Sequence, residues 1–114
     1  MAIYKEKTRI VKENPGTGKI IADHFIDEKL FGGANKLYAR ITLHPGCGVP
    51  LHKHEGNNET YYIVQGEGLY QDGKKKVKVK TDYVTFCPDG GSHALMNTGK
   101  EDLVFIALIA NTIK

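Results

Sequence analysis

Three histidines and one glutamate stand at positions from which they could hold a single metal ion. His52 and His54 are two residues apart in a segment that reads as a β-strand, and Glu59 follows a Gly-Asn-Asn turn. Residues two apart on a strand project from the same face, so both imidazoles can point to one centre. Glu59 returns beside them once the chain reverses, and His93, after a second glycine-rich turn, can complete the set.

This combination of side chains indicates a particular class of ion. Imidazole nitrogens with one carboxylate suit divalent manganese, iron, nickel, copper or zinc, and leave coordination positions open to water or a substrate. Without an ion, four polar side chains buried together would be costly. We therefore predict a divalent transition metal, one of these five, bound by His52, His54, Glu59 and His93.

The apolar pattern predicts the strands that must position these side chains. Apolar residues alternate with a period of two, or form short β-branched and aromatic runs between clusters of Gly, Pro, Asn and Asp. We expect no helix beyond one or two turns within 23–31. Many short strands in one chain of 114 residues predict a β-sandwich or a small barrel in a single domain. The expected strands are 3–11, 20–26, 36–44, 51–54, 59–65, 68–72, 75–80, 83–87, 93–97 and 103–109.

Two spaced motifs resemble those of the cupin family. The first spans 46–66, and its fixed positions are Gly46, His52, His54, Glu59 and Gly66. The second spans 82–97, and its fixed positions are Pro88, Gly90, His93 and Asn97. It departs from the family only at Asp82, where a glycine is usual. Because Asp is one of the few residues that tolerate a left-handed backbone, we expect the turn to survive.

The resemblance implies an all-β fold for residues 1–114, namely the cupin-type double-stranded antiparallel β-helix, or jelly-roll barrel. It also implies a metal near one open end of the barrel and commonly a homodimer formed through sheet pairing. The local support for a homodimer is the N-terminal strand 3–11, which has no expected partner strand.

Two functions compete at this point. The first is a metalloenzyme of the oxygenase type, most simply a dioxygenase, in which oxygen and a small organic substrate meet at a redox metal. The alternative is a cupin that binds or senses a metal and a small ligand without turnover, because no lid or second acid–base pair stands out in the sequence. Cupins with the same ligand set also include decarboxylases and isomerases, so an activity of that kind stays open.

Parity along the strands predicts what surrounds the metal. Tyr61 shares the parity of Glu59, so it should face the cavity, either as an aromatic wall or as a catalytic residue that orients a substrate. Asn97 shares the parity of His93 and is expected to close the turn that follows it. Arg40 either faces the cavity and holds a substrate carboxylate, or faces outward, which we favour.

Composition argues against several partner classes. The net charge of +3 is too small to indicate a nucleic acid, and the lysines of 74–80 are explained by a strand with one valine face and one solvated face. With neither a secretory signal nor an apolar run of membrane-spanning length, we expect a cytoplasmic protein with no membrane partner. Cys47 and Cys87 are interpreted as small apolar residues rather than a disulfide.

Overall fold

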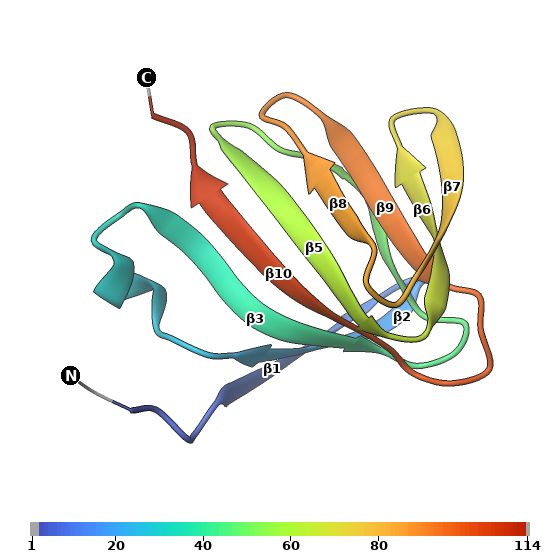
Figure 1. Ribbon diagram of the computed structural model, residues 1–114, viewed down its shortest axis with the longest axis horizontal. Helices are drawn as coiled ribbons and strands as arrows, with labels where there is room; N and C mark the ends of the chain where they lie inside the picture. Colours follow the sequence, from blue (N-terminus) through green and yellow to red (C-terminus); the bar gives the residue numbers. More distant parts are fainter. Residues whose placement is uncertain (1–2, 114) are drawn as a thin grey trace.

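Two antiparallel β-sheets make up the computed structural model, which describes residues 3–113 (Figure 1). The six-stranded sheet comprises, in order, β1 (Thr8–Asn14), β2 (Gly18–His24), β3 (Asn35–Leu43), β10 (Leu103–Asn111), β5 (Asn57–Gln65) and β8 (Val84–Cys87). The four-stranded sheet comprises β4 (Gly48–Lys53), β9 (Ser92–Asn97), β6 (Glu67–Asp72) and β7 (Lys75–Lys80). The predicted all-β fold of ten strands is confirmed.

The helical content is as small as the sequence indicated. A single turn of 3-10 helix, η1 (Glu28–Phe31), lies between β2 and β3, and Asp27 caps it by accepting a hydrogen bond from the Lys29 N–H. Within residues 3–113, no helix has the length and apolarity needed to cross a membrane.

The N-terminal strand differs from its prediction. Residues 3–7 form no strand, and β1 instead runs from Thr8 to Asn14, where it pairs along its whole length with β2. β1 pairs with β2 because the chain reverses tightly between them, where Gly16 and Gly18 adopt the positive φ values of 80° and 75° that glycine accepts easily. The expectation of an unpaired N-terminal strand was therefore wrong, and the homodimer stays a prediction that rests on the family resemblance.

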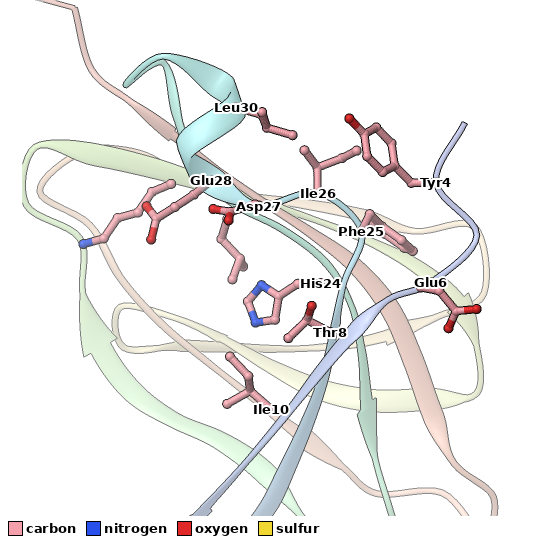
Figure 2. A pocket seen from close by; sticks show the side chains of 12 residues that line it. Tyr4, Glu6, Thr8, Ile10, His24, Phe25, Ile26, Asp27, Glu28 and Leu30 are labelled. Atoms are coloured by element: carbon pink, nitrogen blue, oxygen red, sulfur yellow. The ribbon is translucent and has the colours of Figure 1, made fainter. Parts of the chain in front are cut away.

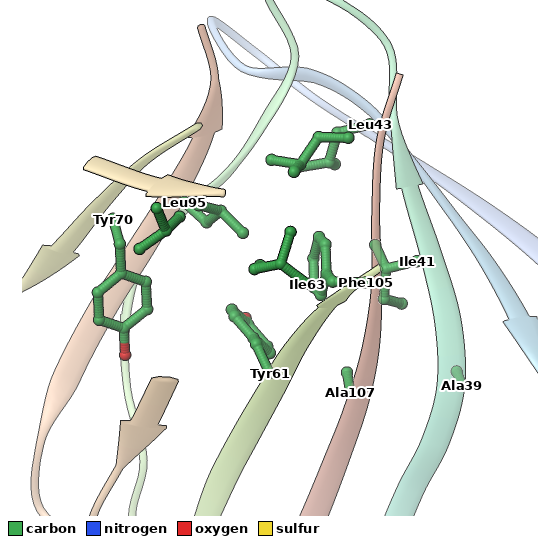
Figure 3. Close-up of a cluster of buried hydrophobic side chains, with 11 residues drawn as sticks. Ala39, Ile41, Leu43, Tyr61, Ile63, Tyr70, Leu95, Phe105 and Ala107 are labelled. Carbon is green, nitrogen blue, oxygen red and sulfur yellow. The ribbon is translucent and has the colours of Figure 1, made fainter. Parts of the chain in front are cut away.

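The core lies between the two sheets (Figure 3). Alternate residues of β3 are buried, while Tyr38 and Arg40 point to the other side, where Arg40 Nη2 lies 3.5 Å from Asp23 Oδ2. The outward position that we favoured for Arg40 is confirmed. The buried core residues come from both sheets and are Ala39, Ile41, Leu43, Tyr61, Ile63, Tyr70, Val79, Leu95, Leu103, Phe105 and Ala107.

The lysine-rich strand β7 lies at one edge of the four-stranded sheet, where lysines discourage pairing with another chain. Val79 turns into the core and is 4% exposed, as predicted for the valine face. Val77 differs from that prediction because it lies nearer the Asp72-Gly73 turn, at the end of the sheet, where 40% of it stays exposed.

Asn97 ties the turn after β9 to the rest of the fold. Its Nδ2 donates to the carbonyl oxygens of Leu43 and Glu101, both at 2.8 Å, and its Oδ1 accepts a hydrogen bond from Gly99 N at 2.9 Å. The side chain is 3% exposed and has no polar atom left for a ligand. The expected structural role of Asn97 is confirmed.

Asp82 has a left-handed backbone, with φ 74°, and is the one non-glycine residue within 3–113 that has a positive φ. Its N–H donates to the Ile63 carbonyl at 2.8 Å, and its Oδ1 accepts a hydrogen bond from the Tyr62 hydroxyl at 2.8 Å. The turn therefore survives without the usual glycine, as expected, and an aspartate side chain contributes a contact that glycine lacks.

We expect Asp82→Ala to destabilise the protein by about 1–2 kcal/mol, because alanine keeps the left-handed strain and loses the contact with Tyr62. Asp82→Gly should stay within about 0.5 kcal/mol of the wild type, since relief of strain offsets the loss of an exposed hydrogen bond. Urea unfolding of the two variants measures the difference. Equal stability of both variants would show that the backbone conformation of Asp82 has no cost.

Candidate metal centre

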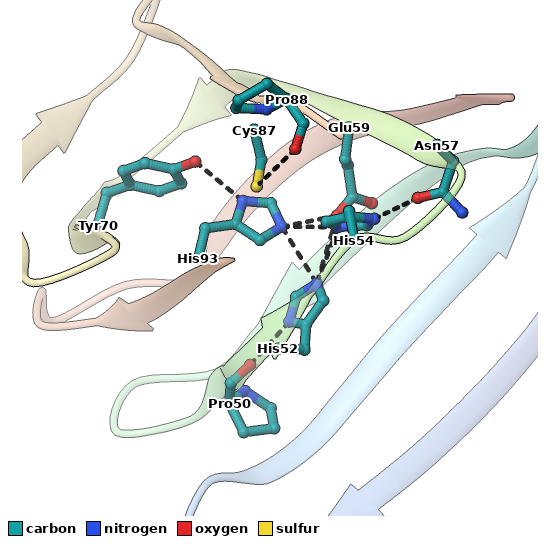
Figure 4. Close-up of polar contacts among 9 residues, drawn as sticks. All are labelled: Pro50, His52, His54, Asn57, Glu59, Tyr70, Cys87, Pro88 and His93. Carbon is teal, nitrogen blue, oxygen red and sulfur yellow. Dashed lines mark hydrogen bonds and ion pairs between the residues drawn. The ribbon is translucent and has the colours of Figure 1, made fainter. Parts of the chain in front are cut away.

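The structure brings the four predicted ligand residues together from both sheets (Figure 4). His52 on β4 and His93 on β9 are direct neighbours across the four-stranded sheet, and His54 follows the last residue of β4. Glu59 comes from β5 in the six-stranded sheet, so the turn between β4 and β5 carries the chain from one sheet to the other. The site therefore spans the gap between the sheets at one end of the fold.

Four ligand atoms converge at this place. The Nε2 atom of His54 lies 3.2 Å from that of His52 and 3.1 Å from that of His93, and the latter two are 3.1 Å apart. Glu59 Oε1 lies 3.0 Å from His93 Nε2, 3.1 Å from His54 Nε2 and 3.6 Å from His52 Nε2. Four atoms at such spacing surround a point about 2 Å from each, which is the usual length of a metal–nitrogen or metal–oxygen bond.

The other ring nitrogens of two histidines fix which nitrogen faces this point. His52 Nδ1 lies 2.8 Å from the carbonyl oxygen of Pro50, and His54 Nδ1 lies 2.6 Å from Asn57 Oδ1. Both oxygens accept hydrogen bonds, so each Nδ1 carries the proton and each Nε2 presents a lone pair to the centre. Lone pairs that face each other at this distance repel unless a cation lies between them, so the donor set fits a divalent metal.

His93 is held by two tyrosines. The Tyr70 hydroxyl lies 2.9 Å from His93 Nδ1, and the Tyr61 ring stacks on the imidazole with centroids 4.9 Å apart and planes inclined by 23°. His93 is itself completely buried, at 0% exposure. The contact with Tyr70 therefore limits rotation of the imidazole in its plane, and stacking on Tyr61 limits its tilt. Burial also raises the pKa of the Tyr70 hydroxyl, to about 12, so this group stays protonated.

The charges in the site follow from burial and from its hydrogen bonds. Burial alone would raise the pKa of Glu59, but its contacts with His52 and His93 outweigh that and lower the pKa to about 2. The contact with Glu59 raises the pKa of His52, against the effects of burial and of the Lys12 charge. Burial lowers the pKa of His93. Glu59 is therefore a carboxylate at neutral pH, and His93 is held as the neutral imidazole that a metal needs.

A cavity of about 340 Å³ opens beside the cluster. Tyr61 forms part of its wall and is 2% exposed, with its ring 4.5 Å from that of Phe105. Burial and the neighbouring Glu59 hold the pKa of Tyr61 well above its ordinary value, so it remains a phenol. The apolar part of the lining consists of Ile10, Ile20, Ala22, Leu37, Ile41, Val49, Phe105, Ala107 and Ile109.

A second cavity, of about 390 Å³, lies between the N-terminal segment, the end of β2 and η1 (Figure 2). His24, Asp27 and Glu28 line it, yet their ligand atoms do not converge. In the part of the chain that the structure describes, the cluster of His52, His54, Glu59 and His93 is the only one with metal-ligand geometry. The slightly larger cavity is therefore not the candidate metal centre.

His44 is not part of the metal-ligand cluster, and neither is Cys87, although Cys87 lies beside it as the partner of Glu59 across β5 and β8 (Figure 4). His44 is exposed and its Nδ1 lies 2.8 Å from Asp102 Oδ1. Both Cys47 and Cys87 are free thiols. Sequence reasoning missed Asn57 and Tyr70, which orient two of the ligands. Asn57 lies in the turn segment that the sequence marked, whereas no sequence pattern distinguished Tyr70 from other aromatic residues of the barrel.

Comparison with known proteins places this geometry in context. A family model described as a cupin domain matches residues 39–109. An oxalate-binding protein of Thermotoga maritima is 42% identical over 101 residues, which cover 89% of this chain and 84% of that protein. The crystal structure of a predicted oxalate decarboxylase from Thermotoga maritima superposes with a TM-score of 0.88 at 36% identity, covering 97% of this chain and 100% of the other.

A larger enzyme shares the fold. The oxalate decarboxylase of Lactobacillus farciminis, solved as a formate complex, superposes with a TM-score of 0.70 at 25% sequence identity. The match covers 92% of this chain but only 32% of that enzyme. The chain thus corresponds to one part of this decarboxylase, to most of the oxalate-binding protein and to the whole of the solved Thermotoga maritima chain.

Proposed function

The chain belongs to the cupin family, and on that premise we propose that it holds a divalent transition metal and uses it to bind small carboxylates such as oxalate. One observation carries the proposal: four ligand atoms converge on a single point beside an apolar cavity. The relative from Thermotoga maritima that is named an oxalate-binding protein supports the choice of ligand.

Each part of the site has a role in such binding. His52, His54, Glu59 and His93 would hold the ion, which would supply positive charge and free coordination positions for carboxylate oxygens. Pro50, Asn57 and Tyr70 fix the orientation of the imidazoles through contacts with their Nδ1 atoms, on the side away from the ion. The apolar walls would lower the local dielectric constant around a bound carboxylate, which would strengthen its attraction to the positive charge.

Binding without turnover fits these relatives better than the oxygenase that the sequence alone suggested. The relatives described above are named for oxalate binding or oxalate decarboxylation, and none of these names is that of an oxygenase. Two of the similar structures are named as oxalate decarboxylases, one of them as predicted. An experiment must therefore test whether this protein decarboxylates the carboxylate that it binds. That Tyr61 orients a substrate stays a prediction, supported by its place in the cavity wall beside Glu59.

Metal analysis and thermal unfolding test the proposal together. We expect the purified protein to contain about one equivalent of a divalent transition metal. Oxalate should raise the unfolding temperature of the metal-loaded protein, by the equivalent of about 2.7 kcal/mol at one hundred times its dissociation constant. Protein stripped by a chelator should show no such shift. Absence of metal would overturn the proposal, and so would a metal-loaded protein whose unfolding temperature does not change with oxalate. Release of formate would show that the protein decarboxylates oxalate rather than only binding it.

A further inference from the structure

One cationic side chain lines the cavity beside the metal cluster. Lys12 lies on β1, the edge strand of the six-stranded sheet, where it pairs with Ile20 of β2. It is the one lysine or arginine among the residues that line this cavity. Lys12 therefore borders the same cavity as His52, His54 and Glu59.

The Lys12 ammonium forms no ion pair with a carboxylate among residues 3–113. Arg9, which lies on the same strand with opposite parity to Lys12, is by contrast bound through two hydrogen bonds to Asp23. An exposed lysine with no partner is ordinary on a surface, but Lys12 borders a largely apolar cavity that three of the four metal-ligand residues also line. This position leaves its charge available to a ligand in the cavity.

The charges of the complete site would match a dianion. A divalent ion bound by one carboxylate and three neutral imidazoles keeps one net positive charge, and Lys12 adds a second at the cavity lining. A monocarboxylate would neutralise only the charge at the ion. A dicarboxylate would neutralise both, and most of the other residues that line the cavity are apolar.

We infer that Lys12 is a specificity-determining residue, whose ammonium pairs with the second anionic group of the bound ligand and makes the site prefer dicarboxylates to monocarboxylates. The inference rests on the proposed function, because it assumes that the first anionic group meets the metal. Lys12 selects the ligand, whereas His52, His54, Glu59 and His93 hold the ion.

The test compares two pairs of ligands on the metal-loaded protein by isothermal titration calorimetry: oxalate and malonate as dianions, acetate and propionate as monoanions. For Lys12→Met, which keeps an unbranched side chain one atom shorter and removes its charge, we expect dianion affinity to fall about five- to tenfold. Affinity for the monoanions should fall less than about threefold, because only a longer-range attraction is lost. Lys12→Arg, which keeps the positive charge, should retain most of the preference for dianions over monoanions.

Lys19→Met is the matched control, because Lys19 is also an exposed lysine of the β1–β2 pair but does not line the cavity. It should leave both classes of ligand unaffected. Metal content is measured in every variant and should equal that of the wild type. If Lys12→Met weakens both classes equally, or neither, the inference is wrong while the proposed function stands. If the wild type binds no carboxylate, the proposed function itself has failed.

Discussion

Replacing His93 with alanine is expected to remove the metal from the protein. His93 supplies one of four converging ligand atoms and is fully buried, so the variant would keep three of the four protein ligands. Loss of an outer residue that only orients a ligand typically costs about 10–100-fold in metal affinity, so loss of the ligand itself should cost more than about 100-fold. Elemental analysis after dialysis against a weak chelator measures the bound metal.

His44→Ala is the control for this experiment. His44 is exposed, pairs with Asp102 and lies outside the cluster, so the variant should keep its metal. Circular dichroism of the His93→Ala protein separates loss of the site from loss of the fold. If the folded His93→Ala variant still binds metal as tightly as the wild type, His93 is not a ligand and the four-residue site is wrong.

Replacing Phe105 with alanine should lower the free energy of unfolding by about 3–5 kcal/mol, more than any other substitution that we discuss. Phe105 on β10 is 0% exposed, packs its ring 4.5 Å from that of Tyr61 and forms part of the cavity wall. The substitution removes an aromatic side chain from the middle of the core and leaves a space that the sheets cannot fill. Urea unfolding of the metal-free protein measures this cost without a contribution from metal binding.

Phe86→Ala makes the same chemical change on the outer side of the six-stranded sheet. Phe86 on β8 is 55% exposed, so its loss should cost less than about 1 kcal/mol. Size-exclusion chromatography of this variant shows whether the substitution also alters self-association. If Phe105→Ala destabilises the protein no more than Phe86→Ala does, the assignment of the core between the sheets is wrong.

Local chemistry in the sequence accounts for most of the site. The two-residue period of a strand predicted that His52 and His54 share a face, and turn residues predicted that Glu59 and His93 open new strands. In the structure Glu59 is instead the third residue of β5, because pairing with β10 extends that strand back to Asn57. The four side chains nevertheless converge as predicted, because their parity within each strand is unchanged.

Residues whose role depends on which strands are neighbours in a sheet could not be predicted from the sequence. Tyr70 reaches His93 because β6 pairs with β9, and Lys12 lines the cavity because β1 folds back on β2. Both placements depend on strand order and register, which involve residues far apart in the chain. The start of β1 was missed for a related reason, since strand propensity alone cannot show that residues 3–7 lack a partner strand.

The origin of the ligands in two sheets has a consequence for the whole fold. An ion held by Glu59 of one sheet and by His52 and His93 of the other would act as a cross-link, closing a ring of chain much as a disulfide does. Ion binding and the packing of the sheets are then thermodynamically linked. A substitution that lets the sheets separate would therefore lower metal affinity even where it lies far from the ion.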